Sequence, residues 1–191
     1  MQDRYNQALK LAAEVHATQI RKGTVNAVGF PLPYITHPVA VSALVQRYGG
    51  TEGQCCAALL HDTLEDGGPQ YRDVIRTQFG EGVLAMVEAC TDGTPDESGH
   101  KAPWKQRKTD YLAHLRDKTG DAVLVSACDK LHNLRSINAD RAELGDAVFE
   151  RFTATKEQTL WYYGELVEIL SAKVTPRLAA ALNQALSTLR Q

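Results

Sequence analysis

The sequence predicts an all-α protein, an irregular bundle of several helices. Apolar residues recur almost everywhere at three- and four-residue spacing, and no run of alternating polar and apolar residues is convincing as a strand. The length of 191 residues, with 43% hydrophobic residues, suffices for one full core and does not demand a second. We therefore expect a single domain over residues 1–191.

The first half of the chain predicts three helices with recognisable beginnings. The first follows Asp3, a plausible cap, and the second starts at Thr36 and Pro38 and extends to Tyr48. The third is capped by Thr51 and ends in an acidic cluster. The apolar face of the first helix comprises Leu9, Ala12, Ala13, His16 and Ile20.

Amphipathic stripes continue to the C-terminus. We expect helices over residues 71–79, 83–90, 103–118, 121–133, 144–171 and 175–190. Glycine and proline indicate loops at residues 23–33, 67–69 and 93–103.

Charge and cysteine content restrict the class of protein. A formal net charge of −2 gives no general attraction to nucleic acid or to an anionic membrane, so we expect neither as a partner. The four cysteines lie in apolar helical contexts without a Cys-x-x-Cys pair, which favours reduced, buried thiols. The sequence shows neither a signal-peptide core nor an apolar run that could span a bilayer, and we therefore expect a cytoplasmic protein.

The segment of residues 61–66 is the most unusual in the chain. The carboxylates at residues 62, 65 and 66 lie one helical turn apart or closer, so their repulsion should destabilise the helix. A bound cation would turn this repulsion into attraction. Imidazole and carboxylate groups suit Mn²⁺ or Fe²⁺ better than a structural zinc ion. The titratable residues of this segment are His61, Asp62, Glu65 and Asp66. Two distant residues, His37 and Asp129, complete the set.

Each distant residue also has a simpler explanation. His37 precedes a proline at a helix start, where a histidine can merely pack or cap. Asp129 follows a buried apolar run and could be a satisfied polar group. The combination is more specific than either residue alone.

This set of residues resembles the ligand set of the HD superfamily of metal-dependent phosphohydrolases. The surrounding sequence resembles, more narrowly, the hydrolase domain of RelA/SpoT-type enzymes. The segments that carry this likeness are residues 21–23, 33–39, 58–66, 79–80 and 129–135. The likeness covers roughly residues 3–170 and leaves no room for a synthetase domain. The chain thus resembles a stand-alone small alarmone hydrolase with an HD-domain bundle.

The resemblance implies a reaction and a cofactor. Family members bind Mn²⁺ through residues that match His37, His61, Asp62 and Asp129, and they remove pyrophosphate from the 3′ position of guanosine tetra- or pentaphosphate. Glu65 and Asp66 match the catalytic acid pair of the family. We expect Glu65 to orient or deprotonate the attacking water, with assistance from Asp66.

The resemblance also implies contacts to a small nucleotide substrate. Arg21 matches an arginine that stacks on the base, although an exposed arginine at a helix end is the simpler interpretation. A basic run around Trp104 lies where the family supplies cations to the 5′ diphosphate, but such runs are usually solvated helix faces. The expected substrate contacts are Arg21, Lys22, Tyr34, Asn133, Lys101, Arg107 and Lys108, together with Lys130 and Arg135, which could instead pair with nearby acids.

Several alternatives stay open at this point. Residues 24–30 form an insertion relative to the family and adjoin the expected base site, so a 3′-pyrophosphorylated adenosine nucleotide, (p)ppApp, is a second possible substrate. The competing classes are another HD phosphohydrolase acting on a 5′-nucleotide or a cyclic dinucleotide, a non-catalytic nucleotide sensor, and a purely structural helical protein.

Overall fold

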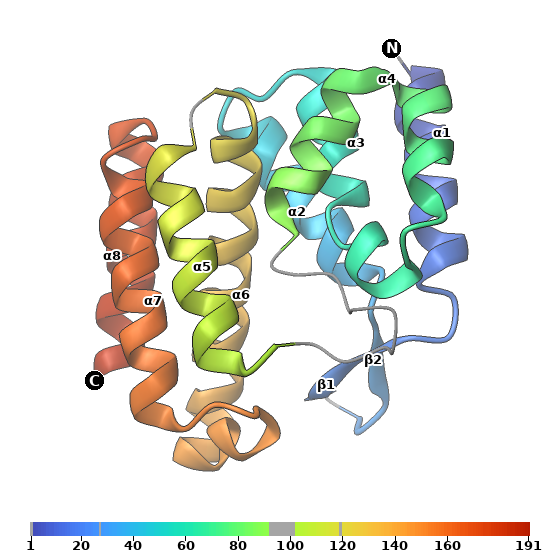
Figure 1. Ribbon diagram of the computed structural model, residues 1–191. Coiled ribbons are helices and arrows are strands. Elements are labelled where there is room, and N and C mark those ends of the chain that lie inside the picture. Colours follow the sequence, from blue (N-terminus) through green and yellow to red (C-terminus); the bar gives the residue numbers. More distant parts are fainter. Residues whose placement is uncertain (1, 27, 92–101, 119) are drawn as a thin grey trace.

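The computed structural model describes residues 2–26, 28–91, 102–118 and 120–191, and it confirms an all-α bundle with one small hairpin. In Figure 1, α1 to α4 lie on one side and α5 to α8 on the other, with the hairpin below them. The helices are α1 (Gln2–Val15), α2 (Thr36–Arg47), α3 (Glu52–Leu60), α4 (Tyr71–Cys90), α5 (Trp104–Asp117), α6 (Ala122–Leu144), α7 (Lys156–Ser171) and α8 (Pro176–Arg190). The short elements are β1 (Ile20–Val25), β2 (Pro31–Pro33), a π-helical turn η1 (Thr63–Gly67) and a 3-10 helix η2 (Gly145–Arg151).

Helix α3 is the centre of the core. It packs against α1, α2, α4 and α6, and residues 54–60 are all buried. A short helix that is apolar all round is stable only when it is covered on every side. Its C-terminal end therefore delivers residues 61 and 62 into the interior. All four cysteines are buried and unpaired, as the sequence predicts.

Helix boundaries agree with the sequence where local capping chemistry sets them. Thr51 caps α3 in a capping box with Gln54. Residues 71–90 form one helix with a kink at Gly80, whose φ is 82°. Asp3 lies inside α1 rather than before it, and the predicted helix over 144–171 is wrong, because η2 and a second capping box at Thr155 divide it.

The hairpin is the main correction to the sequence analysis, which assigned residues 23–33 to a loop. Strands β1 and β2 pair antiparallel, with Ile20 opposite Pro33 and Val25 opposite Pro31. The strands are short, irregular in register and rich in glycine and proline, so the alternation that signals a strand is absent. The predicted loop over 93–103 lies mostly outside the described residues.

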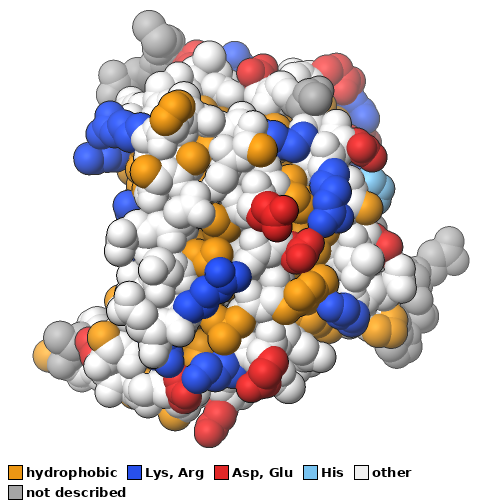
Figure 2. Space-filling view, turned by 90° about the vertical axis from the view of Figure 1, so that its left-hand side faces the viewer, with side chains coloured by type: hydrophobic (Ala, Val, Ile, Leu, Met, Phe, Trp, Pro, Cys, Tyr) orange, Lys and Arg blue, Asp and Glu red, His pale blue; other side chains and the backbone are white. Residues whose placement is uncertain are grey.

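The molecular surface carries charges of both signs. Figure 2 shows the face on the side of α7 and α8, where acidic, basic and apolar side chains are interspersed and neither charge forms a continuous area. Within the described part of the chain, no helix has the length and apolar character needed to cross a membrane.

Candidate active site

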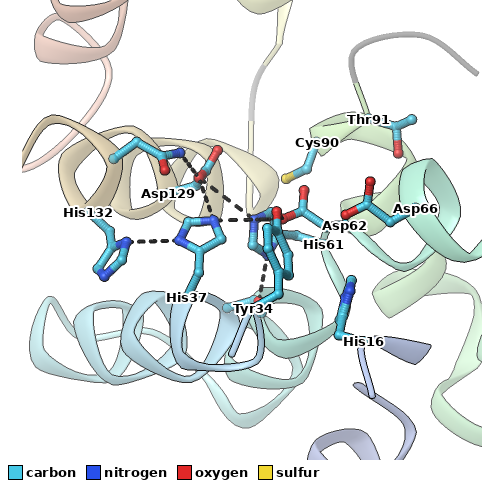
Figure 3. A network of polar contacts seen from close by, with 12 residues as sticks. His16, Tyr34, His37, His61, Asp62, Asp66, Cys90, Thr91, Asp129 and His132 are labelled. Carbon is cyan, nitrogen blue, oxygen red and sulfur yellow. Dashed lines mark hydrogen bonds and ion pairs between the residues drawn. The ribbon is translucent and has the colours of Figure 1, made fainter. Parts of the chain in front are cut away.

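Three buried side chains from three different helical segments meet at one point (Figure 3). His37 belongs to the first turn of α2, His61 directly follows α3, and Asp129 lies within α6. One ligand atom of each lies within 4.8 Å of the others. The packing of α2, α3 and α6 in the core thus brings together residues that are far apart in the sequence.

The hydrogen bonding of His61 leaves one ring nitrogen available to a ligand. Its Nδ1 lies 2.8 Å from the carbonyl oxygen of Ala58, and because that oxygen can only accept, Nδ1 carries the proton. Nε2 is buried without a hydrogen-bond partner among the described residues, and it faces carboxylate oxygens of Asp62 at 3.0 Å and Asp129 at 3.7 Å. An imidazole lone pair held against carboxylates calls for a proton or a cation between them.

His37 is arranged in the same way. Its Nδ1 lies 2.8 Å from Nδ1 of His132. Burial, aided by His37, lowers the pKa of His132 to about 4, so His132 is neutral at pH 7, and its tautomer with the proton on Nε2 can accept a hydrogen bond from Nδ1 of His37. Nε2 of His37 then presents its lone pair 3.2 Å from Asp129 Oδ1 and 3.6 Å from Asp62 Oδ2. Two such nitrogens and two carboxylates around one point fit a divalent cation.

The two carboxylates are held from behind by other side chains. Lys130 Nζ lies 2.7 Å from Asp129 Oδ2, and Asn133 Nδ2 donates to Asp129 Oδ1 at 2.6 Å. Burial alone would raise the pKa of Asp129, but Lys130 and the two histidines outweigh it and hold that pKa well below the usual range. Lys130 is therefore engaged in a partly buried ion pair, which was the alternative to its predicted substrate contact.

Tyr34 supports the second carboxylate. Its hydroxyl donates to Asp62 Oδ2 at 2.6 Å, and burial together with Asp62 raises the pKa of Tyr34, so the hydroxyl keeps its proton. The ring lies between those of His16 and His37, with centroid distances of 4.8 and 5.7 Å. Tyr34 thus contacts Asp62 directly besides lining the larger of the two cavities described next.

Two cavities adjoin the cluster, and the turn η1 presents one acid to each. The larger, of about 480 Å³, is lined by Asp66, and the smaller, of about 250 Å³, by Glu65. Of the predicted substrate contacts, Arg21, Lys22, Tyr34 and Asn133 line the larger cavity, and Lys22, Arg107 and Lys108 line the smaller. Burial, reinforced by Lys130, lowers the pKa of Lys108 to about 8.

Arg21 connects the larger cavity to the carboxylates. Its guanidinium lies 5.6 Å from the centroid of the Tyr34 ring, and Nη2 donates to Asn133 Oδ1 at 3.1 Å. Asn133 therefore uses its amide oxygen for Arg21 and its amide nitrogen for Asp129.

One predicted substrate contact, Arg135, is exposed and lines neither cavity. Another, Lys101, lies outside the described residues. Conversely, His132 belongs to the site although it was not predicted, and its spacing of three residues from Asp129, which places both on one face of α6, is a signal that could have identified it. Two further residues in the wall of the larger cavity were not predicted from the sequence, namely Thr24, in the unpredicted hairpin, and Arg151, at the end of η2, which donates to the Thr24 hydroxyl.

Comparison with known families agrees with this geometry. Residues 8–159 match the family model described as the HD domain. The chain belongs to the HD-domain family. This confirms the resemblance to HD phosphohydrolases that the sequence analysis reported.

Within this family, the chain is similar to proteins named guanosine-3′,5′-bis(diphosphate) 3′-pyrophosphohydrolase MESH1. The protein from Xenopus tropicalis is 35% identical over 133 residues, covering 69% of this chain and 68% of the relative. The human protein is 34% identical over 134 residues with the same coverage. A probable enzyme of the same activity from Synechocystis is 33% identical, but the match covers only 16% of its length.

Two solved structures share the fold. One, described as a metazoan orthologue of SpoT that hydrolyses ppGpp, superposes with a TM-score of 0.72 and 24% identity, covering 96% of this chain and 94% of that one. The other, lmo0812 from Listeria monocytogenes, gives a TM-score of 0.67 and 23% identity, covering 81% of this chain and 96% of that one. At these identities the likeness establishes the fold.

Proposed function

We propose that this HD-domain protein hydrolyses the 3′-pyrophosphate of guanosine tetra- or pentaphosphate, (p)ppGpp. The observation that carries the proposal is the convergence of two imidazole lone pairs and two carboxylates beside cavities lined with basic residues. The names of the MESH1 relatives support the choice of substrate.

We assign His37, His61, Asp62 and Asp129 as ligands of a divalent cation, with Mn²⁺ as the ion. The donor set is two nitrogens and two carboxylates without thiolate, which suits a cation of intermediate hardness. Such a cation lowers the pKa of water and offsets the charge of phosphoryl oxygens. Lys130, Asn133 and Tyr34 hold the two carboxylates in place.

The two acids of η1 act on the water. Glu65 orients it and accepts its proton as the oxygen attacks the phosphorus attached to O3′ of the ribose. The bond between that phosphorus and O3′ breaks, its electron pair stays on O3′, and O3′ takes up a proton. The products are pyrophosphate and a nucleoside 5′-diphosphate or 5′-triphosphate. Asp66 assists from the wall of the larger cavity.

The cavities divide the substrate between them. The larger one accommodates the nucleoside, with the base stacked on Arg21, whose flat delocalised charge suits that contact. The smaller one provides cations for phosphate oxygens from Lys22, Arg107 and Lys108.

A nucleotide with adenine in place of guanine is the second candidate substrate. Strand β1 contributes Ile20, Arg21, Lys22 and Thr24 to the larger cavity, and the insertion begins within this strand, at Thr24. The hairpin therefore forms part of the wall that surrounds the base.

The test is release of pyrophosphate by the Mn²⁺-loaded protein from the 3′,5′-bis(diphosphates) of guanosine and adenosine, assayed in parallel. Asp62→Ala should abolish release, whereas Asp73→Ala, which alters an exposed acid of α4, should not. Release from either nucleotide establishes the reaction and ranks the two bases. Release from neither would refute the proposal and favour another HD phosphohydrolase or a sensor.

A further inference from the structure

His16 lies next to the proposed catalytic acids although the sequence places it among the apolar positions of the first helix. It directly follows α1, its side chain is 2% exposed, and its ring contacts that of Tyr34. In Figure 3 it lies on the Asp66 side of Tyr34, whereas His132 lies beyond His37 on the other side. The mechanism described above does not use it.

A chain of two hydrogen bonds connects His16 to Asp66. His16 Nδ1 lies 2.7 Å from Gln19 Oε1, and Gln19 Nε2 donates to Asp66 Oδ2 at 3.0 Å. The opposite orientation of the Gln19 amide would set its oxygen against the carboxylate, so the nitrogen must face Asp66. The amide oxygen then faces His16, and Nδ1 of His16 carries the proton.

The second ring nitrogen shows that His16 does more than fill space. Nε2 is buried and has no hydrogen-bond partner among the described residues. A buried polar atom without a partner costs free energy, whereas leucine or phenylalanine would fill the same position without that cost. What the histidine adds over such an apolar side chain is the hydrogen bond that its Nδ1 makes.

Backbone hydrogen bonds fix the positions of the residues that link His16 to Asp66. The N–H of Gln19 donates to the carbonyl of His16 at 3.2 Å, and the N–H of Tyr34 donates to the carbonyl of Gln19 at 2.9 Å. His16, Gln19 and Tyr34 thus form one unit at the base of the hairpin. Asp66, in contrast, is exposed, so packing does not select its side-chain conformation.

We propose that His16 is a positioning residue, which acts through Gln19 to hold the Asp66 carboxylate in its orientation for the reaction. The inference rests on the proposed function, because Asp66 is one of its two acids. His16 also supports the ring of Tyr34, and the same histidine thereby stabilises the surroundings of both Asp62 and Asp66.

His16→Phe tests the proposal because it keeps the ring and removes the donor. We expect kcat to fall about three- to tenfold, the range for loss of one modest hydrogen bond, with KM and bound Mn²⁺ unchanged. His16→Asn should restore most of kcat, because its amide nitrogen can donate from a position close to that of Nδ1. His114→Phe, on the exposed face of α5, is the matched control.

A double-mutant cycle with Gln19→Met separates positioning from a merely structural role. If His16 acts through Gln19, the double variant should have the same kcat as Gln19→Met alone. Additive losses, or an unchanged kcat in His16→Phe, would overturn the inference. If His16→Phe does not fold, the inference is tested by kcat of His16→Asn, which should stay near the wild-type value. A kcat as low as that of Gln19→Met would overturn the inference. An inactive wild-type protein would instead refute the proposed function.

Discussion

The two halves of the site are built in different ways. The helical half, which we propose holds the metal, is made of regular helices, and His37, His61 and Asp129 in it are only 1%, 2% and 5% exposed. The other half, called substrate-facing after the proposed function, is made of β1, η1, the start of α5 and the segment after η2, and Asp66 and Lys22 within it are exposed. The buried helical half fixes the proposed ligands, and the short irregular elements shape what can bind next to them.

The largest effect should come from the helical half. His61→Ala removes a ring nitrogen that faces both carboxylates, and we expect Mn²⁺ affinity to fall and turnover to drop by about a thousandfold. Isothermal titration with Mn²⁺ and a pyrophosphate assay measure the two losses. His114→Ala is the matched control. Wild-type Mn²⁺ affinity in His61→Ala would contradict the assignment of metal binding to the helical half.

Glu65→Gln tests the boundary between the halves, since only His61 and Asp62 separate η1 from the buried end of α3. The amide keeps the size of the side chain but cannot accept the proton of water, so kcat should fall about 10²- to 10³-fold. Metal content should stay at the wild-type value. Glu81→Gln, on an exposed stretch of α4, should behave like wild type, and retained activity in Glu65→Gln would remove Glu65 from the mechanism.

The sequence predicts the helical half well because packing and spacing determine it. Thr51 begins α3 through its capping box, and the apolar run that follows can end only in the core, where His61 emerges. Asp129 and Asn133 are one turn apart on α6, so both face the same side. Capping, burial and spacing are local signals. The meeting of His37 with His61 and Asp129 depends on the packing of α2, α3 and α6, and the sequence indicates it only through the resemblance to the HD family.

The substrate-facing half is predicted less well because long-range contacts determine it. The hairpin sequence shows no alternation of polar and apolar residues. The ion pair between Lys130 and Asp129 depends on how far each side chain is buried, which the sequence does not show. His16 shows the same limit. Its spacing correctly indicates burial, but only the positions of Gln19 and Asp66 show what the ring contacts.

Arg21→Ala tests the substrate-facing half alone. Loss of the guanidinium beside Tyr34 and Asn133 should raise KM about tenfold, while bound Mn²⁺ is unchanged. Steady-state kinetics with the guanosine bis(diphosphate) measure the change. Arg177, which lies 5.7 Å from the Tyr48 ring centroid on another part of the surface, provides a matched Arg→Ala control. A loss of metal on Arg21→Ala would show that the halves are not separable.

The smallest expected effect is a pH dependence of substrate binding. The pKa of Lys108 is lowered to about 8 by burial and by Lys130, against the opposing effect of Glu65, Asp129 and Asp62. The ammonium is therefore charged below pH 8 and loses its charge as the pH rises through 8, so KM should increase a few-fold between about pH 7 and pH 9. Lys108→Arg, which stays charged, should flatten that profile. If KM of Lys108→Arg varied with pH in the same way as KM of the wild type, Lys108 would be excluded from phosphate binding.

The central claim is that the helical half holds one divalent cation, and anomalous diffraction at the manganese edge tests it most directly. Crystals grown with Mn²⁺ should give one strong peak between Nε2 of His37 and His61 and the carboxylates of Asp62 and Asp129. No peak at that point, or a peak elsewhere, such as at the exposed Asp146, would contradict the account.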